Sequence, residues 1–405
     1  MVLSISTMII ASSLINGFQK EIRNKVFGFW AHINVVPFSL TKSFEESGTY
    51  LYQDFYADKT LIPEAAHIQA VAIKGGLLKT REAFEGIVLK GIGNDFNTKF
   101  FQPYLKEGSM LSADSNVSRK QLLISTATAK RMNLKLGDRV AVNFMDKKVR
   151  TRAFNICGIY ETGLDEFDKQ YALSSISVIQ DLNNWGRDTV GGFEIFLKEE
   201  NLFKSRAKAY FLTIFGAFLT PEYAAELRTD PLDKIANDIY YRMNNTNLDV
   251  QTIKYQNPGI FDWLELQTMN ELIILSLMIV VAAINMMTAL LILILERTNM
   301  IGILKALGST NASIRRMFIY YALVIIGGGL LVGNVFGIGL CLLQKHFQFV
   351  KLPQESYYIS SAPIDLNLTW ILVLNILTLF ICTLLLLLPS RIISNISPVK
   401  AIRFD

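Results

Sequence analysis

Three long apolar stretches without a charged residue constrain this chain more than any other feature. They run from Leu272 to Leu295, from Met317 to Leu343 and from Leu368 to Leu388. A helix needs about 20 consecutive apolar residues to cross the hydrocarbon core of a bilayer, and one charge at its centre would cost roughly 3 kcal/mol. Each stretch meets both conditions, so we predict three membrane-spanning helices.

A further uncharged stretch begins the sequence. The segment MVLSISTMIIASSLINGF reaches Lys20 without a charge and continues into the amphipathic-looking segment QKEIRNKVFGF. It lacks the positively charged leader and the small-residue cleavage pattern of a secretory signal peptide. We therefore predict a first span whose cytoplasmic end is short or missing in this sequence. A cleaved signal peptide is the alternative, and mass spectrometry of the mature N-terminus would identify it.

Basic residues beside the spans predict the orientation of the chain. Short cytoplasmic loops of membrane proteins carry an excess of Lys and Arg. The loop between the second and third spans and the C-terminal tail carry such an excess, whereas the loop between the third and fourth spans is balanced. The basic residues of the first loop and the tail are Arg297, Lys305, Arg315, Arg316, Arg391, Lys400 and Arg403. We therefore expect both segments in the cytoplasm.

The expected fold is a membrane protein with four transmembrane α-helices and a large α+β periplasmic domain inserted between the first and second helices. Residues 1–26 would form the first span and its extension, and residues 27–262 the periplasmic domain. Residues 263–405 would form a three-helix transmembrane domain with a short cytoplasmic helix at 296–308. The middle part has more than 200 residues of ordinary globular composition, which is enough for a large domain.

Within the middle part, alternating and periodic apolar residues predict a mixture of strands and helices. Strands are expected at Ile33 to Val36, His67 to Ile73, Ile87 to Ile92, and on either side of a short helix at Ala127 to Met132 and a Gly137-Asp138 turn. Helices are expected in ISVIQDLNNW and PLDKIANDIYYRMNN. The apolar cluster Tyr210 to Leu219 is too short to span a bilayer and is expected to pack in a core or on a lipid surface.

The composition gives little support to nucleic-acid binding, a disulfide framework or a metal centre. The formal net charge of +5 is modest for 405 residues. The three cysteines are odd in number, and the three histidines lack the close spacing of a local metal site. These residues are Cys157, Cys341, Cys382, His32, His67 and His346.

Motifs for catalysis are also missing from the sequence. It contains no Walker A pattern and no GxSxG elbow, and the glycine cluster GIGNDF from Gly91 to Phe96 indicates a turn. The acidic residues Asp165, Glu166 and Asp168 could bind a cation or act in acid/base chemistry, but an exposed turn is the simpler interpretation. We therefore expect no catalytic residue, no bound metal and no enzymatic activity in this chain.

The loop after the second span carries the most informative motif. It reads ERTNMIGILKALGSTNASIRRMF from Glu296 to Phe318 and begins directly at the end of the span. Ile301, Leu304, Lys305 and Leu307 recur at helical spacing before the helix-breaking pair Gly308-Ser309. A helix with an apolar ridge and basic ends, lying along the inner face of a membrane, can dock in a groove of a partner. An interfacial turn that only joins two spans is the alternative.

This motif resembles the coupling helix of the four-span ABC permeases typified by MacB, FtsX and the LolC/LolE lipoprotein-releasing subunits. The segments NGFQKEIRNKVFGFWAHINV, FNICGIYETGLDEFDKQYALSSISVIQDL, YYISSAPIDLN and SPVKAIRFD resemble the LolC/LolE branch in particular. One difference is Met300, where many members have an acidic residue. The resemblance implies that ATPase coupling involves Glu296, Arg297, Met300, Gly302, Ile303, Leu304, Lys305, Ala306, Leu307 and Gly308.

The resemblance also implies a function, a location and a set of partners. A permease of this branch extracts acylated lipoproteins from the bacterial inner membrane and hands them to a periplasmic carrier similar to LolA. A separate cytoplasmic ATPase similar to LolD binds the ATP and Mg, so no cofactor is expected on this chain. A second permease copy or a paralogue, the lipoprotein substrates and membrane lipids complete the expected partners, and nucleic acid is not among them.

Residues inside the spans suggest packing and cavity roles. Gly329, Gly333 and Gly337 recur every four residues and would allow close helix packing, either within the subunit or between two subunits. Asn285 and Asn334 are polar in apolar surroundings and should face protein or a cavity. Flexible methionines suit varied acyl chains. A lipid cavity could therefore involve Met8, Ile15, Met278 and Met286, for which core or lipid contact is the alternative.

Two other functions fit the same superfamily. A MacB-type permease would act in mechanotransmission or efflux with an adaptor and an outer-membrane duct. An FtsX-type scaffold would regulate a cell-wall hydrolase without moving a substrate, but such scaffolds usually have a much smaller outer domain. A neighbouring gene for an adaptor would favour efflux, whereas one for a lipoprotein carrier would favour release.

Overall fold

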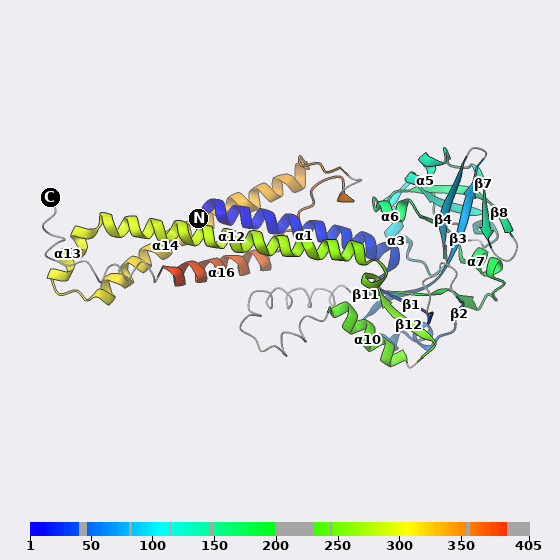
Figure 1. Cartoon of the computed structure of the whole chain (residues 1–405), viewed down its shortest axis with the longest axis horizontal. Coiled ribbons are helices and arrows are strands. Elements are labelled where there is room, and N and C mark those ends of the chain that lie inside the picture. Colours follow the sequence, from blue (N-terminus) through cyan, green and yellow to red (C-terminus); the bar gives the residue numbers. More distant parts are fainter. Residues whose placement is uncertain are drawn as a thin grey trace. The chain divides into compact units, whose positions relative to one another are not determined.

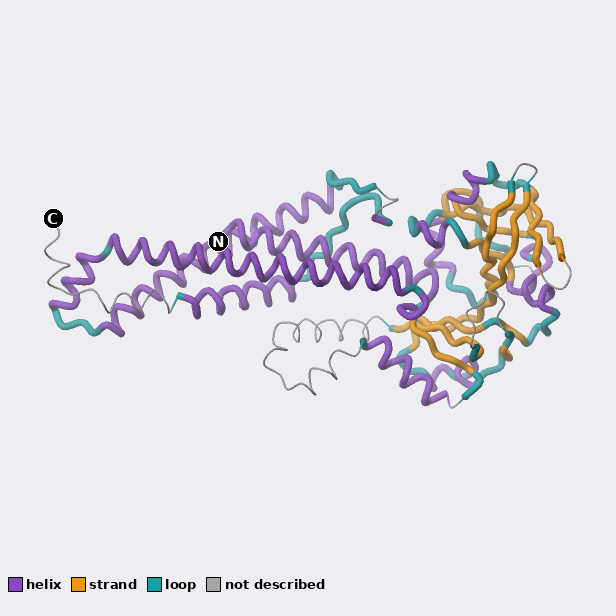
Figure 2. The backbone as a smooth tube through the Cα atoms, viewed as in Figure 1, coloured by secondary structure: helices purple, strands orange, loops and turns teal. Residues whose placement is uncertain are grey.

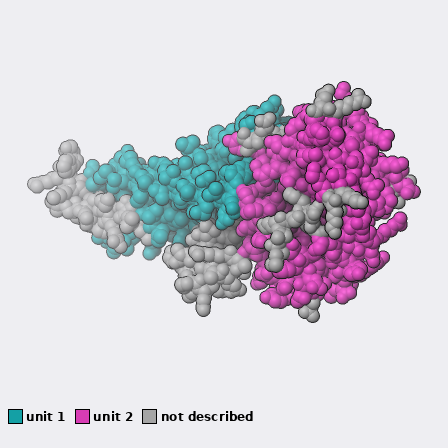
Figure 3. All heavy atoms as spheres, turned by 45° about the vertical axis from the view of Figure 1, so that its right-hand side comes forward, with its two compact units in different colours: residues 1–22, 261–353, 359–405 teal, residues 23–260, 354–358 magenta. Residues whose placement is uncertain are grey.

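The computed structural model describes residues 1–39, 47–80, 83–113, 115–145, 149–198, 230–243, 245–353 and 357–386. The chain forms two compact units, coloured separately in Figure 3. Unit 1 consists of Met1–Ile22, Phe261–Pro353 and Ile359–Asp405, and unit 2 of Arg23–Ile260 and Gln354–Tyr358. The chain passes between the units after Ile22 and after Ile260, and the domain limits expected at 26 and 262 stay a prediction. The apolar cluster Tyr210 to Leu219 and the basic C-terminal tail lie outside the described residues.

Unit 1 is built from long helices (Figures 1 and 2). They are α1 (Val2–Trp30), which continues into unit 2, α12 (Pro258–Glu296), the short α13 (Thr298–Ala306), α14 (Asn311–Phe347) and α16 (Leu368–Leu385). Among the described residues, four helices are long and apolar enough to cross a membrane by length and composition, namely α1, α12, α14 and α16. These helices contain the four apolar stretches of the sequence, apart from the last residues of the fourth.

The core of unit 1 lies between these helices. Helix α14 shows how it forms, because its buried residues recur every three or four positions from Ile314 to Gln344 and so occupy one face. This face packs against apolar residues of the other helices, including Ile5, Ala282 and Ile371. Other residues of α12, α14 and α16 point outward, and many of them are large and apolar. Outward apolar side chains are typical of helices in a lipid environment.

Unit 2 is an α+β domain around a mixed ten-stranded sheet (Figures 1 and 2). The strands are β1 (Ile33–Pro37), β3 (Ala65–Lys79), β4 (Phe84–Ile92), β5 (Leu105–Gly108), β6 (Gln121–Ser125), β7 (Arg139–Met145), β8 (Val149–Tyr160), β9 (Tyr171–Ser175), β11 (Gly192–Leu197) and β12 (Leu248–Thr252). The order is β12-β1-β11-β3-β4-β9-β6-β8-β5, and β7 pairs with β3 and β8. Pairs β4–β9 and β6–β8 are parallel, whereas the long β3–β4 hairpin is antiparallel.

Short helices and a small second sheet complete unit 2. The helices are α2 (Asp54–Ala57), α3 (Thr98–Phe101), α4 (Ser115–Ser118), α5 (Thr126–Arg131), α6 (Asp165–Asp168), α7 (Ile176–Asn183), α10 (Pro231–Met243) and α11 (Ile253–Gln256), and strands β2 (Thr49–Tyr50) and β10 (Thr189–Val190) pair with each other. The apolar faces of α5 and α7 help to close the sheet core. The strands and helices expected from the sequence of this region are confirmed wherever the residues are described.

The C-terminal end of α1 is anchored inside unit 2 by a buried ion pair. Lys90 on β4 donates to the backbone carbonyl of Phe29 and contacts Glu194 on β11 at 2.6 Å. Gln69 donates to the other carboxylate oxygen of Glu194 at 2.6 Å. The Lys90 ammonium also lies 4.4 Å from the centroid of the Trp30 ring. A cation at the C-terminus of a helix is favoured by the helix dipole.

Candidate functional site

Helix α13 is separated from its neighbours by well-formed helix ends. It ends at Ala306, and Gly308, two residues later, has a φ of +91°, which is favourable only for glycine. This conformation lets the N–H of Gly308 donate to Lys305 O and the N–H of Ser309 to Leu304 O, both at 3.0 Å. The side chain of Thr310 then caps α14 by accepting from the N–H of Ser313. The sequence thus specifies α13 as a distinct helix between two longer ones.

One side of α13 packs into unit 1 and the other is exposed. Ile301 is fully buried, Gly302 is also buried, and Leu304 packs against the bundle core. Met300, Ile303 and Leu307 are 36%, 53% and 79% exposed. Their spacing of three and four residues places them on one face.

This exposed apolar face differs from the ridge expected from periodicity. Ile301 and Leu304 face the bundle, so the accessible ridge is formed by Met300, Ile303 and Leu307. Among the other residues implied by the resemblance, Glu296, Arg297, Ala306 and Gly308 are exposed and Lys305 is half-buried. The structure thus brings these residues together on and beside one short helix, while their role in coupling stays a prediction.

The three glycines of α14 lie against α1 within the same chain. A methyl group at Gly329, Gly333 or Gly337 would approach Met1, Ile5 or Ile9 respectively, at distances of 2.8 to 3.1 Å. In addition, the Ser6 hydroxyl donates to the carbonyl oxygen of Gly333 at 3.0 Å. The small residues therefore permit close approach of two helices inside unit 1.

The residues expected to line a lipid cavity are part of the packed bundle. Met8, Ile15 and Met286 are buried, and Met278 is partly buried. The three methionines belong to the apolar core of unit 1 or pack against it. Their role as a cavity for acyl chains stays a prediction.

The sequence predicted one polar contact of the bundle, but it did not predict a larger group of hydrogen-bonded side chains. Asn334 and Asn375 exchange two side-chain hydrogen bonds of 2.8 and 2.9 Å, as expected for a polar residue that faces protein. Asn285, by contrast, is exposed in this chain. The missed group consists of Ser12, Asn16, Glu271 and Trp370. Its only signal in the sequence is an acidic residue directly before the apolar run at Leu272.

The acidic cluster of unit 2, which consists of Asp165, Glu166 and Asp168, has a structural role. Asp168 is 4% exposed, so the expectation of an exposed turn is wrong for this residue. Its carboxylate accepts from the Thr162 hydroxyl at 2.7 Å and from the N–H of Gly163 at 2.9 Å, which fixes the preceding loop. Burial raises the pKa of Asp168, and these hydrogen bonds act in the opposite direction.

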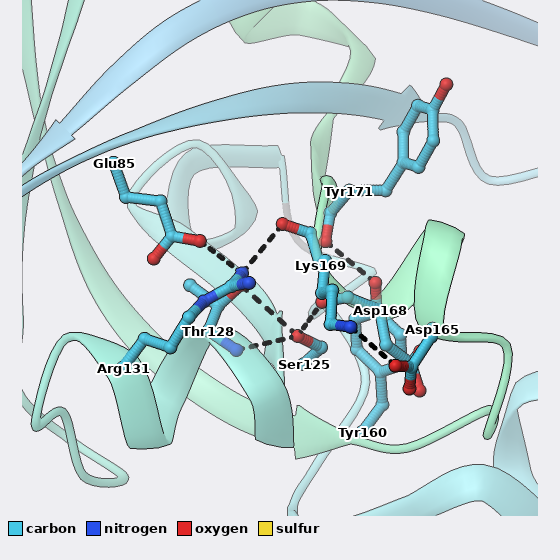
Figure 4. Close-up of polar contacts among 9 residues, drawn as sticks. All are labelled: Glu85, Ser125, Thr128, Arg131, Tyr160, Asp165, Asp168, Lys169 and Tyr171. Carbon is cyan, nitrogen blue, oxygen red and sulfur yellow. Dashed lines mark hydrogen bonds and ion pairs between the residues drawn. The ribbon is translucent and has the colours of Figure 1, made fainter. Parts of the chain in front are cut away.

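Neighbouring side chains extend this network (Figure 4). Ser125, at the N-terminal end of α5, donates to the backbone carbonyl of Asp168, and Asp165 pairs with Lys169 at 2.5 Å. Arg131 contacts both Glu85 and the carbonyl of Lys169. Within the described residues, no group of three or more His, Cys, Asp or Glu side chains is arranged to hold a metal ion.

Comparisons with known proteins match both units. Residues 1–202 match the MacB-like periplasmic core domain, and residues 272–398 match the FtsX-like permease C-terminal family. The lipoprotein-releasing system transmembrane protein LolC of Xylella fastidiosa strain Temecula1 is 23% identical, with 100% of this chain and 92% of that protein covered. LolC of Neisseria meningitidis serogroup B is 22% identical, with the same coverage. LolE of Haemophilus influenzae is 20% identical, with 99% and 91% covered.

The two family matches and the apolar helices define the class of this protein, which is a multi-pass membrane permease with a MacB-like periplasmic domain. Relatives at this level of similarity extend over the full chain and carry LolC and LolE names. The chain is therefore a permease of the LolC/LolE type.

Proposed function

We propose that this chain is the permease subunit of an ABC transporter that extracts acylated lipoproteins from the inner membrane and passes them to a periplasmic carrier. The lipoprotein-releasing names of the relatives support the substrate, and their coverage of the whole chain supports a common architecture. These relatives give no support to the efflux or regulatory alternatives. Permeases of this family work with an ATPase and a second permease, which here would be a LolD-like protein and a copy or paralogue of this chain.

The proposed topology has four spans in the inner membrane. Helices α1, α12, α14 and α16 would cross it, with the domain between α1 and α12 in the periplasm. The loop with α13 would then lie in the cytoplasm, as the positive-inside rule predicts. This arrangement puts the exposed face of α13 within reach of a cytoplasmic ATPase.

Lipoprotein release requires energy because acyl chains are costly to expose to water. A chain of roughly 15 methylenes at about 0.8 kcal/mol each would cost on the order of 12 kcal/mol. Closure of the paired ATPases would push on the α13 helices, shift the spans and move the lipid anchor into a shielded path through the outer domain. In this mechanism the permease supplies no chemistry and transmits a conformational change.

The observation that carries the proposal is the exposed apolar face of α13. Met300, Ile303 and Leu307 project from a short helix whose opposite side is fixed in the bundle core by Ile301. An apolar helix face of this kind fits the groove of a partner protein. Because the other side is anchored, a force on this face is transmitted to α12 and α14, between which α13 lies in the sequence.

Charge substitutions on this face test the proposal. The double variant Ile303→Asp with Leu307→Asp should lower lipoprotein release by at least about 10-fold, because two desolvated carboxylates would oppose docking. Release and ATPase association are measured with the complex in inner-membrane vesicles. Asn311→Asp adds a charge beside α13 but off this face, at a helix start where an acid is tolerated, and should behave like the wild type. Undiminished, fully coupled ATPase in the double variant would overturn the docking role.

A further inference from the structure

The end of α14 and the residues after it carry aromatic rings and lysines on an exposed surface. Phe347, the last residue of α14, is 67% exposed and Phe349 is 62% exposed. Gln348 between them has a φ of +47°, so the chain turns between the two rings. Lys345 and Lys351 are also exposed. We call Lys345, Phe347, Phe349 and Lys351 the aromatic-basic cluster. Exposed apolar side chains grouped beside polar ones frequently mark a contact with a membrane or a partner.

Hydrogen bonds hold the chain after α14 against the bundle. Gln344, a buried residue of α14, accepts from the N–H of Val350 at 3.1 Å and donates to the carbonyl of Ala362 at 3.1 Å. Further along, the N–H of Asp365 donates to the carbonyl of Ser13 on α1 at 3.0 Å. These contacts fix the segments that leave α14 and approach α16, so the aromatic-basic cluster is part of an ordered surface of unit 1.

The two lysines of the cluster keep their charge unpaired within the described part of the chain. Of the two acidic residues that balance them in the sequence, Asp365 pairs with Lys20 at 2.9 Å and Glu355 lies outside the described residues. Among the described residues, neither Lys345 nor Lys351 forms an ion pair. The helix dipole favours a cation such as Lys345 in the last turn of α14, but it does not account for Lys351, which lies beyond the helix.

The aromatic part of the cluster continues the outward apolar stripe of α14. Phe336, Leu340 and Leu343 are exposed large apolar residues, and Phe347 follows them at the same spacing of three and four positions. Under the four-span topology proposed above, this stripe faces acyl chains and ends at the periplasmic surface of the membrane. The cluster would then lie where the hydrocarbon region meets the headgroups.

We propose that the aromatic-basic cluster binds an anionic phospholipid in the periplasmic leaflet of the inner membrane. The two rings would insert at the boundary between acyl chains and headgroups, and Lys345 and Lys351 would pair with the phosphate group. Long lysine stems can lie along apolar surface while the ammonium stays among the headgroups. The inference uses the proposed topology and goes beyond the proposed function, because the ligand is a lipid of the membrane and not the cargo.

A photoreactive ring placed inside the cluster identifies the lipid that contacts it. Phe349→p-benzoylphenylalanine keeps an aromatic side chain, and the full chain is illuminated in nanodiscs of phosphatidylcholine with phosphatidylglycerol as the minor lipid. Mass spectrometry of the adducts should show phosphatidylglycerol enriched by about 10-fold or more over its share of the nanodisc, as expected for two lysines near an anionic headgroup. Added Lys345→Gln with Lys351→Gln should reduce the enrichment to about 2-fold or less, whereas arginine at both positions should preserve it.

A matched variant and a soluble competitor separate the possible results. Lys130→Gln with Lys135→Gln removes the same charge from the exposed surface of unit 2 and should leave the enrichment intact. Adducts of both lipids in proportion to their amounts, or adducts with a protein in place of lipid, would overturn the inference. Competition by soluble glycerophosphoglycerol, which has the headgroup without acyl chains, would show a site for free phosphate esters and would also overturn it.

Cysteine labelling checks the topology separately from the lipid. Lys351→Cys is introduced together with Cys157→Ser, since Cys341 and Cys382 are buried, and spheroplasts are treated with a membrane-impermeant maleimide. We expect labelling from outside. Labelling only after permeabilisation would contradict the proposed topology, and the inference with it. Labelling from outside combined with unselective lipid adducts would overturn the inference alone and leave the proposed function standing.

Discussion

Lys90 and Glu194 form an ion pair whose side chains are both 0% exposed. Burial lowers the pKa of Lys90, and the adjacent carboxylate of Glu194 acts in the opposite direction. Such a pair contributes little net stability compared with an apolar pair, but the loss of one partner leaves a buried charge. Because Lys90 also binds the carbonyl of Phe29, the pair determines how the last turn of α1 is held in the outer domain.

Substitution of Lys90 by methionine should destabilise unit 2 strongly. Lys90→Met leaves the Glu194 carboxylate buried with Gln69 as a donor, and we expect a loss of about 3–5 kcal/mol in the free energy of unfolding. The measurement is urea denaturation of the purified protein in detergent. The double variant Lys90→Met with Glu194→Leu removes the stranded charge and should recover part of the loss. A double variant less stable than Lys90→Met would contradict this account.

His32 should make the stability of unit 2 depend on pH. Burial lowers its pKa to about 4, and its Nδ1 accepts from the N–H of Leu197 at 3.2 Å. The folded pKa lies below the ordinary value of about 6.5, so the unfolded chain takes up a proton first. The contribution is complete above pH 6.5 and is lost as the pH falls toward 4, by up to about 3 kcal/mol. Denaturation at pH 7.5 and 5 should show a smaller pH effect in His32→Gln than in the wild type, and an identical effect would refute it.

At the scale of the elements, the contact between α1 and α14 requires a small residue at particular positions of α14. A Cβ atom at Gly333 would lie 2.9 Å from Cβ of Ile5, whereas Gly328 on the same helix has nothing within 4 Å. Gly333→Val should therefore overpack the bundle and cost about 1–3 kcal/mol, seen as a lower midpoint of thermal unfolding in detergent. Gly328→Val carries the same change in helix propensity and should have little effect. Equal midpoints for the two variants would show that α1 does not depend on this contact.

Sequence periodicity predicted the elements better than it predicted which face of an element is exposed. The long uncharged runs correspond to α12, α14 and α16, and most expected strands and short helices of unit 2 are present. On α13, however, the same apolar pattern fits two adjacent faces. Ile301 is buried and Ile303 exposed only because of the neighbouring helices, and a single-element pattern carries no information about them.

The hydrogen-bonded group of Ser12, Asn16, Glu271 and Trp370 could not be derived from local sequence. Its hydrogen bonds join Ser12 to Glu271 and to Trp370, which are 259 and 358 positions away. Each of these residues is unremarkable in its own segment, since serine is common in membrane helices and Trp370 suits an interface. Only the packing of three helices brings them together. The expectation that Asp168 is exposed was wrong for the same reason, because its burial depends on the loop that folds over its carboxylate.

At the scale of the whole molecule, two helices contribute residues to both units. Helix α1 has its residues up to Ile22 in unit 1 and its remaining residues in unit 2, and α12 begins in unit 2 before it enters unit 1. Phe29, in the last turn of α1, is fully buried in the outer domain. Under the proposed function, a displacement produced at α13 would reach the outer domain through the backbone of these two helices.

Interrupting α1 between the units tests this transmission directly. Three glycines inserted between Ile22 and Arg23 weaken the helix and rotate its two parts by about 300° relative to each other. ATPase binding through α13 should persist, whereas lipoprotein release in vesicles should fall by at least about 10-fold. The same insertion between Gly137 and Asp138, at a turn with open space around Gly137, should leave release unchanged. If the α1 insertion also leaves release unchanged, motion does not reach the outer domain through this helix, and α12 becomes the remaining continuous connection to test.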